Sequence, residues 1–566
     1  MDTDTEKRLL LAFLLSFGFL IVWRVFFMPP APPAPKPAAS RHSASPKSGA
    51  KPKPTAKPPA AVKLPVVQGQ SSRDIVIQSQ FYRVTLSTRG GVVTNWILRK
   101  YRDENGKLLD MVNASACAAL GYPLSLEFAD QALSEKVNSA VFVATPSADF
   151  FQAPQTVTLT YSDGKTEIRK EISFGPAYEV KVSVSAFNGR RYLPVSIKWP
   201  GGAGDQSLPQ AEKEEFSLAF YDTGGGIKTV AEKKADSETI IPGPVEFAGL
   251  EDHFFASAFL PGSDHEAFRY LRQLWSPPGW SGKEPPKALT AILGNTERSP
   301  LRFSLLVAPK DIEVLRAVNP QLSGLVNFGW FSFFAKPLFL AMRWINVHFT
   351  HNWGWAIVVL TVLINTVFFP LKIKSIRSAQ SMQKIAPMVK EIQNRYKQYK
   401  FNDPRKQRMN QEIMKLYQEH GVNPLGGCLP MVAQLPIIYA FYEVLESSIA
   451  MRHAPWIWWI KDLSVPDHLY ILPSIMIVAS FVMQKMTPMP TADPAQQRMM
   501  MLAPLFVGII FFKLAAGVVL YYFTYNLVAI AQQVVINRMV PPPAPVTPPA
   551  ARSQGGSARK PAAVKG

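Results

Sequence analysis

Long apolar segments are unevenly distributed along the 566 residues of this chain. One follows the first eight residues, and the others lie within about the last 220, where a basic segment separates them. Because about 20 apolar residues cross a hydrocarbon core of about 30 Å, we expect six transmembrane helices. They are predicted at Leu9–Met28, Trp353–Leu371, Leu425–Leu445 and Leu469–Met483, with two more in Met499–Val540 joined by a turn at Ala515–Gly517.

Two alternatives to this interpretation were considered. Any single segment could be the core helix of a large soluble protein, but six in one chain favour a membrane protein. The first span could be a cleaved signal peptide, because Lys7 and Arg8 precede it. Its exit sequence, Met28–Pro33, is rich in proline and offers no clear cleavage site, so an uncleaved anchor is favoured.

Lys and Arg close to a span tend to stay in the cytoplasm, and this bias predicts the orientation. Residues 371–423 carry twelve Lys or Arg against four Asp or Glu, so this segment is predicted to be cytoplasmic. The loop Glu446–His468 is nearly balanced in charge and is expected on the opposite side. Both termini are then expected in the cytoplasm, in agreement with an even number of spans.

The region between the first two spans begins as a tether and continues as a β domain. Pro29 to about Pro65 consists mostly of Pro, Ala, Lys and Ser, which favour extended conformations. Beyond it, Tyr178–Ser185 alternates apolar and polar residues, and Ser162–Lys165 predicts a hairpin turn. Strands are predicted at Phe81–Ser87, Val92–Leu98, Thr156–Tyr161, Thr166–Phe174 and Leu301–Ala308. Asp74 to about Val318 is thus expected to form a single large β-sandwich outside the membrane.

The basic segment after the second span has the periodicity of two helices. Asp403 as N-cap and Pro404 at the first helical position would start the second of them. An antiparallel helical hairpin is expected, and a solvated charged linker is the alternative. The apolar seam of the two arms consists of Ile385, Val389, Ile392, Tyr396 and Tyr399, then Met409, Ile413, Leu416 and His420.

Several polar residues fall at membrane depth. Thr361 and Asn365 lie one turn apart in the second span, Gln434 lies in the third, and Asn526, Gln532 and Gln533 lie in the sixth. Polar groups in hydrocarbon are costly, and they usually face a bundle interior or a water-filled cavity. Ordinary hydrogen bonding between helices and a hydrated groove open to the cytoplasm both remain possible interpretations.

The net charge of +20 could indicate nucleic-acid binding. The basic residues concentrate beside predicted spans, however, which favours anionic lipids and ribosomal RNA as partners and not DNA. Cys117 and Cys428 are predicted on different elements, so a disulfide is not expected. Gly224–Thr229 lacks the glycine that a phosphate loop has before its lysine, and it is interpreted as a turn.

Searches for catalytic or metal motifs also gave no site. His265 and Glu266 are followed by Arg269 where a zinc protease needs a second histidine, and Ser381–Lys384 lies on the charged hairpin. His348 and His351 are interpreted as interfacial anchors and not as metal ligands. No enzymatic activity, cofactor or metal is therefore expected.

A set of motifs spread over four spans is specific enough to indicate a family. The chain closely resembles the YidC-type membrane protein insertases, in the Gram-negative form with a large periplasmic domain. The motifs are Val422-Asn423-Pro424-Leu425-Gly426-Gly427-Cys428-Leu429-Pro430, Gln434-Leu435-Pro436-Ile437, Tyr470-Ile471-Leu472-Pro473, Asp493-Pro494-x-Gln496-Gln497 and Gly517-x-x-Leu520-Tyr521-Tyr522-x-x-x-Asn526.

The resemblance implies an insertase of the bacterial inner membrane that inserts nascent membrane proteins, alone or with the Sec translocon, and helps them fold without nucleotide hydrolysis. It implies a groove open to cytoplasm and lipid, to which we assign Thr361, Asn365, Gln434, Tyr521, Tyr522 and Asn526. The family usually has an arginine where this chain has Asn365. We therefore hypothesise that Asn365, Thr361 and Gln434 keep the groove wet, while Lys372 and Lys374 at its mouth attract acidic substrates.

The expected fold is an all-α bundle of five core transmembrane helices plus an anchor helix, with a periplasmic β-supersandwich of the mutarotase-like type and a cytoplasmic helical hairpin. Two other functions remain open, a secondary transporter and a membrane-anchored periplasmic enzyme acting on sugars. The domains are predicted at 1–28 (anchor), 29–68 (tether), 69–322 (β domain), 323–350 (interfacial amphipathic helix), 351–540 (helical core, with the hairpin at 375–423) and 541–566 (basic disordered tail).

Overall fold

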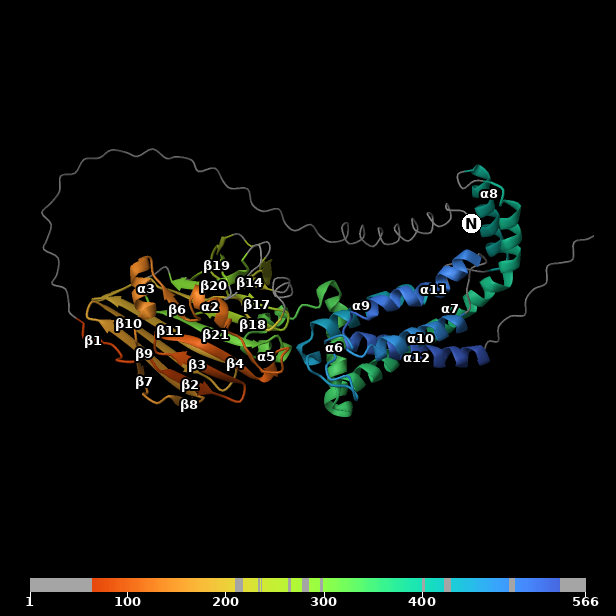
Figure 1. Cartoon of the computed structure of the whole chain (residues 1–566). Coiled ribbons are helices and arrows are strands. Elements are labelled where there is room, and N and C mark those ends of the chain that lie inside the picture. Colours follow the sequence, from red (N-terminus) through yellow and green to blue (C-terminus); the bar gives the residue numbers. More distant parts are fainter. Residues whose placement is uncertain are drawn as a thin grey trace, which may run out of the picture. The chain divides into compact units, whose positions relative to one another are not determined.

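The computed structural model describes residues 64–208, 217–232, 235, 237–262, 266–276, 285–295, 299–399, 403–421, 429–487 and 494–539. The predicted anchor, most of the tether, the tail, Cys428 and the motif Val422–Cys428 lie outside these residues. The described chain begins with a β domain and continues as a helical region (Figure 1).

The largest sheet of the β domain has 11 strands, in the order β1-β9-β10-β11-β21-β18-β17-β14-β15, with β12 on β11 and β7 on β9. β1 lies within the predicted tether, so the folded domain begins a few residues earlier than the sequence predicted. The bounds are β1 (Val66–Val67), β7 (Val143–Thr145), β9 (Gln155–Asp163), β10 (Thr166–Phe174), β11 (Glu179–Asn188), β12 (Arg191–Tyr192), β14 (Leu218–Asp222), β15 (Lys228–Ala231), β17 (Phe247–Glu251), β18 (Phe255–Pro261) and β21 (Leu301–Pro309).

Two further sheets have five strands each, in the orders β16-β19-β20-β13-β6 and β5-β4-β3-β2-β8. The only parallel pairing among the described strands joins β2 to β8. The bounds are β2 (Asp74–Gln78), β3 (Tyr82–Ser87), β4 (Val92–Arg102), β5 (Leu108–Asp110), β6 (Ser125–Glu127), β8 (Phe150–Gln152), β13 (Ser196–Trp199), β16 (Glu238–Ile241), β19 (Glu266–Leu274) and β20 (Lys287–Asn295).

The predicted strands are confirmed, and the hairpin between β9 and β10 shows why. Gly164 has a φ of 88°, a value that glycine adopts without strain. The Asp163 side chain accepts hydrogen bonds from the backbone N–H groups of Lys165 at 2.9 Å and Thr166 at 2.6 Å. On β11, Val180, Val182 and Val184 are buried as the alternation predicted.

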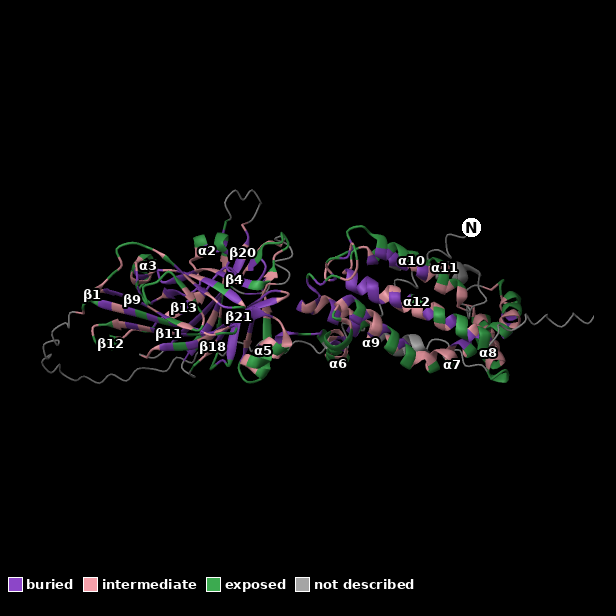
Figure 2. Ribbon diagram, turned by 90° about the horizontal axis from the view of Figure 1, so that it is seen from below, coloured by how far each residue is buried: buried purple, intermediate pink, exposed green. Residues whose placement is uncertain are grey.

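The three sheets share one apolar core, which Figure 2 shows as the buried interior of the β domain. Trp96 of β4 lies 5.9 Å from Trp199 of β13, between ring centroids, and Tyr82 of β3 lies 6.3 Å from Phe174 of β10. Side chains from every sheet thus interdigitate, as in a layered β-sandwich. Cys117, buried on α2 (Ala114–Leu120), is a free thiol whose pKa burial raises to about 12.

Lys170 of β10 is fully buried inside this core, and burial lowers its pKa to about 7. Its Nζ lies within hydrogen-bonding distance of the carbonyls of Gly90 at 2.9 Å, Gly91 at 2.8 Å and Leu124 at 2.8 Å. Since an unpaired buried carbonyl is costly, this amino group holds the β3–β4 turn and the segment before β6 against the large sheet.

The helices follow in chain order, with the short ones in or next to the β domain. The helical region contains five long helices at the positions of the last five predicted spans (Figure 1). The bounds are α3 (Gln131–Ser139), α5 (Ile312–Val318), η2 (Pro320–Leu325), η3 (Gly329–Phe331), α6 (Ser332–Ile345), η4 (Asn346–Thr350), α7 (Trp353–Arg395), α8 (Pro404–Glu419), α9 (Leu429–Ser447), η5 (Ile449–Met451), α10 (Ile471–Met486), α11 (Pro494–Phe511) and α12 (Ala516–Met539).

Two of the described helices, α7 and α12, are long and apolar enough to cross a membrane, and α10 and part of α11 form shorter apolar helices. The predicted turn between the last two spans is present, although it begins earlier, at the end of α11. α12 is buried along its whole first turn and beyond, from Ala516 to Tyr521, so it lies at the centre of the bundle (Figure 2).

The helix that contains the second predicted span does not end at Pro370-Leu371. α7 continues for 43 residues through both Pro370 and Pro387, and at 1.5 Å per residue it is about 65 Å long. A proline removes one backbone hydrogen bond, and a helix in an apolar bundle tolerates that loss when packing holds the adjacent turns. The span and the first arm of the predicted hairpin are therefore one continuous helix.

The interfacial amphipathic helix predicted at residues 323–350 corresponds to α6. It buries Ala335, Phe339, Met342 and Ile345 at helical spacing, whereas Phe333 is 82% exposed. An apolar side chain on the open face of an amphipathic helix suits a membrane interface.

Replacing Lys170 with Met should destabilise the β domain by about 3 kcal/mol, because three buried carbonyls lose their hydrogen-bond donor. The decrease in unfolding free energy can be measured with the full chain in detergent, by denaturant titration followed through tryptophan fluorescence. Lys165→Met, at the exposed turn of the same hairpin, is the matched control and should change little. Equal stabilities of the two variants would contradict the assigned role of Lys170.

Candidate functional site

Polar side chains follow one face of α7 through an otherwise apolar stretch. Thr361 Oγ1 donates a hydrogen bond to the Ile357 carbonyl at 2.6 Å, and Asn365 Nδ2 donates to the Thr361 carbonyl at 2.8 Å. Thr361 is 0% exposed and Asn365 is 7% exposed. Both side chains therefore meet part of their hydrogen-bonding requirement within their own helix.

α12 carries the polar groups that connect α7 to the other helices. Asn526 Nδ2 donates to Ser480 Oγ of α10 at 2.9 Å and to the Tyr522 carbonyl at 3.0 Å. One and a half turns further on, Gln532 Nε2 donates to the Asn365 carbonyl of α7 at 3.0 Å. α12 is thus joined by side-chain hydrogen bonds to α10 on one side and to α7 on another.

Gln434 of α9 also contacts α12. Its Oε1 accepts a hydrogen bond from Tyr525 Oη of α12 at 3.4 Å, and its side chain is partly exposed. Tyr521 stacks on Phe441 of α9 with centroids 4.5 Å apart, whereas Tyr522 lies 4.8 Å from Phe511 of α11. A half-open wall of amide and phenol groups results between α9 and α12.

A lysine occupies one end of this polar face. Lys372 lies two turns after Asn365 on α7, and its Nζ donates to Gln532 Oε1 at 3.2 Å and to the Ala529 carbonyl at 3.4 Å. Gln532 therefore bridges Asn365 and Lys372. Lys374, by contrast, is exposed.

The structure thus brings the predicted site residues together only in part. Lys372 and the Asn365 carbonyl both contact Gln532 of α12, and Gln434 contacts Tyr525 of the same helix. The roles of Ser480, Tyr525 and Gln532 as partners were missed. Tyr525 lies one turn after Tyr521, so helical spacing was the available signal.

The residues of the predicted hairpin form a contact between α7 and α8. Ile385, Val389 and Ile392 are buried, and Tyr396 Oη donates to Glu412 Oε1 at 2.6 Å. Met409, Ile413 and Leu416 are half-buried on α8, whereas His420 is exposed, contrary to the predicted seam. His420 Nδ1 donates instead to the Leu416 carbonyl of its own helix.

The start of α8 is capped as the sequence predicted. The Asp403 side chain accepts a hydrogen bond from the Arg405 N–H at 2.9 Å, and Pro404 occupies the first turn, where no backbone donor is needed.

The end of the bundle far from Lys372 is closed by the segment Ser448–Tyr470, which we call the α9–α10 loop. Its carbonyls at Val465 and Leu463 accept hydrogen bonds from the Ala516 and Gly517 N–H groups at 2.8 and 2.9 Å, at the start of α12. Asn352, the N-cap of α7, donates to the Pro455 carbonyl at 3.0 Å. The loop thereby satisfies the free backbone donors of one helix end and holds a second helix.

Comparisons with known proteins bear on both halves of the chain. Residues 74–341 match the family model of the YidC periplasmic domain, and residues 344–543 match that of the 60Kd inner membrane protein. Membrane protein insertase YidC of Wolinella succinogenes is 30% identical over 547 residues, which span 94% of each chain. The insertase YidC of Cupriavidus necator is 35% identical over 475 residues, which span 81% of each chain.

This chain belongs to the YidC family of membrane protein insertases. The family resemblance that the motifs indicated is thereby confirmed, together with a β-rich periplasmic-type domain and a helical membrane region. A solved structure of an active YidC insertase covers 83% of this chain and 94% of its own, with a TM-score of 0.34 and 18% identity.

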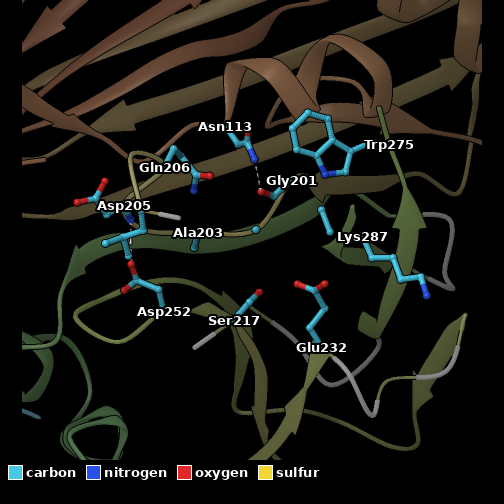
Figure 3. Close-up of a pocket in the computed structure, with 13 residues that line it drawn as sticks. Asn113, Gly201, Ala203, Asp205, Gln206, Ser217, Glu232, Asp252, Trp275 and Lys287 are labelled. Atoms are coloured by element: carbon cyan, nitrogen blue, oxygen red, sulfur yellow. Dashed lines mark hydrogen bonds between the residues drawn. The ribbon is translucent and has the colours of Figure 1, made fainter. Parts of the chain in front are cut away.

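The β domain of this YidC-family chain contains a small polar cavity, shown in Figure 3. Its lining includes Asn113, Asp205, Glu232, Trp275 and Lys287, and its volume of about 40 Å³ has room for about three water molecules. Sugar hydrolysis would require carboxylates able to exchange protons. The Asp205 and Asp252 oxygens already accept hydrogen bonds from backbone N–H groups, Ser207 and Arg452. These two carboxylates are therefore held in structural contacts, and Glu232 is the third carboxylate among the lining residues.

The α9–α10 loop of this insertase contains a titrating pair. Asp462 Oδ2 lies 3.0 Å from His453 Nδ1, and this hydrogen bond raises the pKa of His453. Because the folded-state pKa is raised, protonated His453 contributes stability that is fully present below the unfolded value of 6.5. That contribution is lost as the pH rises through the folded-state pKa.

His453→Gln should therefore lower Tm at about pH 6 and have a smaller effect at a higher pH, above the folded-state pKa of His453. Thermal unfolding of the full chain in detergent at the two pH values measures the difference. His348→Gln, at an exposed site whose Nδ1 donates to the Trp344 carbonyl, is the control. A Tm decrease that does not depend on pH would contradict the assigned role of the pair.

Proposed function

We propose that this insertase transfers hydrophobic segments of nascent proteins into the inner membrane along the polar face between α7, α9 and α12. The observation that carries this proposal is two hydrogen-bonded sets of polar groups, Lys372–Gln532–Asn365 and Tyr525–Gln434, inside helices that are otherwise apolar. Such groups are costly in hydrocarbon and mark a path for polar substrates.

The energetics explain why such a face is useful. Placing one charged residue at the centre of a membrane-spanning helix costs about 2.5–3.5 kcal/mol on the insertion scale. A polar face that reaches part of the way across shortens the distance over which the substrate's hydrophilic flank is unsolvated. Burial of the apolar segment contributes about 0.8 kcal/mol per CH₂ group and drives the transfer without nucleotide hydrolysis.

Lys372 takes the place of the missing groove arginine in this proposal. Asn365 carries no charge and cannot attract an acidic tail, but Gln532 links its carbonyl to the Lys372 ammonium two turns away. Lys372 is partly enclosed while Lys374 is exposed. The ammonium of Lys372 would receive the acidic flank, and Lys374 would raise its local concentration at the mouth.

The orientation and partners follow from the charge distribution. The excess of Lys and Arg in residues 371–423 supports a cytoplasmic location for the α7–α8 hairpin, and it supports contacts with anionic lipids and the ribosome. The β domain would then lie in the periplasm, with the α9–α10 loop closing the periplasmic end. Nascent membrane proteins are the substrates in this proposal, with or without the Sec translocon.

Replacing both Lys372 and Lys374 with Gln should slow insertion of an acidic-tailed substrate about fivefold, which corresponds to about 1 kcal/mol for one screened charge pair. Asn365→Ala should have a smaller effect, because the backbone carbonyl that Gln532 contacts remains. The measurement is the rate of protease protection of the substrate in proteoliposomes.

A substrate with a neutral tail is the control and should be inserted at similar rates by all three proteins. A greater loss with Asn365→Ala than with the lysine variant would reject the electrostatic part of the proposal. So would an equal loss for both substrates with the lysine variant.

A further inference from the structure

Arg452 is a buried cation in the α9–α10 loop, and its partners belong to the β domain. Only 2% of its side chain is exposed. Its Nη2 donates a hydrogen bond to Asp205 Oδ2 and another to Glu104 Oε1 at 3.3 Å. Asp205 is as enclosed as Arg452, with 1% of its side chain exposed, while Glu104 is at the edge of the contact.

The β domain holds Asp205 in place for this contact. The Asp205 N–H donates to Asp252 Oδ2 at 2.9 Å, and its Oδ1 accepts hydrogen bonds from the Ser207 N–H at 2.8 Å and Oγ at 2.6 Å. Gly204 has a φ of 96°, and a Cβ there would lie 1.8 Å from Asp252 Oδ2. Glycine is therefore required for Asp205 and Asp252 to approach so closely.

Two aromatic rings complete the pocket around the guanidinium. Its Cζ lies 5.5 Å from the Phe254 ring centroid and 5.3 Å from that of Phe255, within the range of a cation–π interaction. The N–H groups of the same two residues donate to Asp252 Oδ1 at 2.8 and 2.6 Å. The turn between β17 and β18 thus supplies both the rings and the carboxylate that positions Asp205.

Two hydrogen bonds flank the buried pair. His453 Nε2 donates to the Arg102 carbonyl at 3.2 Å, and His253 Nε2 donates to the Glu446 carbonyl at 3.0 Å. Three separate segments of the β domain, around Glu104, Asp205 and Phe254, therefore converge on the α9–α10 loop.

We propose that Arg452 clamps the β domain to the α9–α10 loop in one fixed orientation. A buried ion pair contributes little net free energy compared with well-packed apolar groups in its place. When one partner is removed, however, the other charge stays buried with neither solvent nor an ion-pair partner. The pair therefore fixes the orientation of the β domain relative to the α9–α10 loop more than it strengthens the contact between them. Because the same loop holds the starts of α7 and α12, the clamp transmits the position of the β domain to the closed end of the bundle.

The test is a distance measurement between two spin labels in the full chain in nanodiscs, so it does not depend on the proposed insertion activity. Lys107→Cys labels the exposed β4–β5 hairpin, and Trp458→Cys labels the loop at a residue that is 89% exposed. Cys428 is replaced by Ser, and the buried Cys117 thiol is left in place. The parent protein should give one narrow distance distribution.

Arg452→Met and the isosteric Asp205→Asn should each lead to loss of the single distance and the appearance of longer ones. The double variant should broaden the distribution no more than Arg452→Met alone, because the two residues act as a unit. Arg343→Met is the matched control. It removes the ion pair with Glu313, in which 28% and 65% of the two side chains are exposed, and it should leave the distribution narrow.

Either of two results would overturn the clamp. The first is a narrow distribution in both Arg452→Met and Asp205→Asn, with circular dichroism showing that both are folded. The second is equal broadening by Arg343→Met, which would show that any ion pair between the two regions has the same effect.

Discussion

The arrangement of the helices depends on the requirement that polar groups in an apolar environment find partners inside the protein. Thr361 and Asn365 bond to carbonyls of α7, and Asn526 pairs with Ser480 of α10. Gln532 uses both ends of its amide, donating to the Asn365 carbonyl and accepting from Lys372. The two bonds between helices, from Asn526 to α10 and from Gln532 to α7, fix how α12 is rotated against these two neighbours.

The exposure of these polar residues is graded along the bundle, which fits the proposed path better than a uniformly wet channel would. Thr361 is fully enclosed, so it serves the packing of α7 more than contact with water. Gln434 and Lys372 are less enclosed, and they lie where a hydrophilic flank could be accepted. At the far end, the α9–α10 loop binds the starts of α7 and α12, so the polar face does not continue through the bundle.

Local patterns in the sequence were sufficient for most elements, because period-2 and period-3.6 alternation depend on neighbouring residues alone. The Asp403–Pro404 helix start was predicted to the residue, and the strands of the β9–β10 hairpin were predicted to within two residues. The continuation of α7 through Pro370 and Pro387 was missed, since proline normally ends a helix and only tertiary packing overrides it. The order of the strands was equally beyond local pattern.

The site residues also divide into those with a local sequence signal and those that depend on tertiary packing. Polar residues at membrane depth were identifiable singly, but their partners Tyr525 and Ser480 look like ordinary helix residues until α9, α10 and α12 are packed. The contact of Arg452 with Asp205 joins residues 247 positions apart and has no sequence signal. The contact matters because both side chains are buried. That burial arises only when the β domain and the loop are packed together, so no local pattern in the sequence shows it.

The most direct test of the central claim is photo-crosslinking from a reactive residue at position 434 to a nascent chain stalled during insertion. Val367, 76% exposed on α7, provides the control position. Our account predicts crosslinks from position 434 to the hydrophilic flank of the substrate, with few from position 367. Crosslinks to that flank from position 367 alone, or equally from both positions, would contradict it.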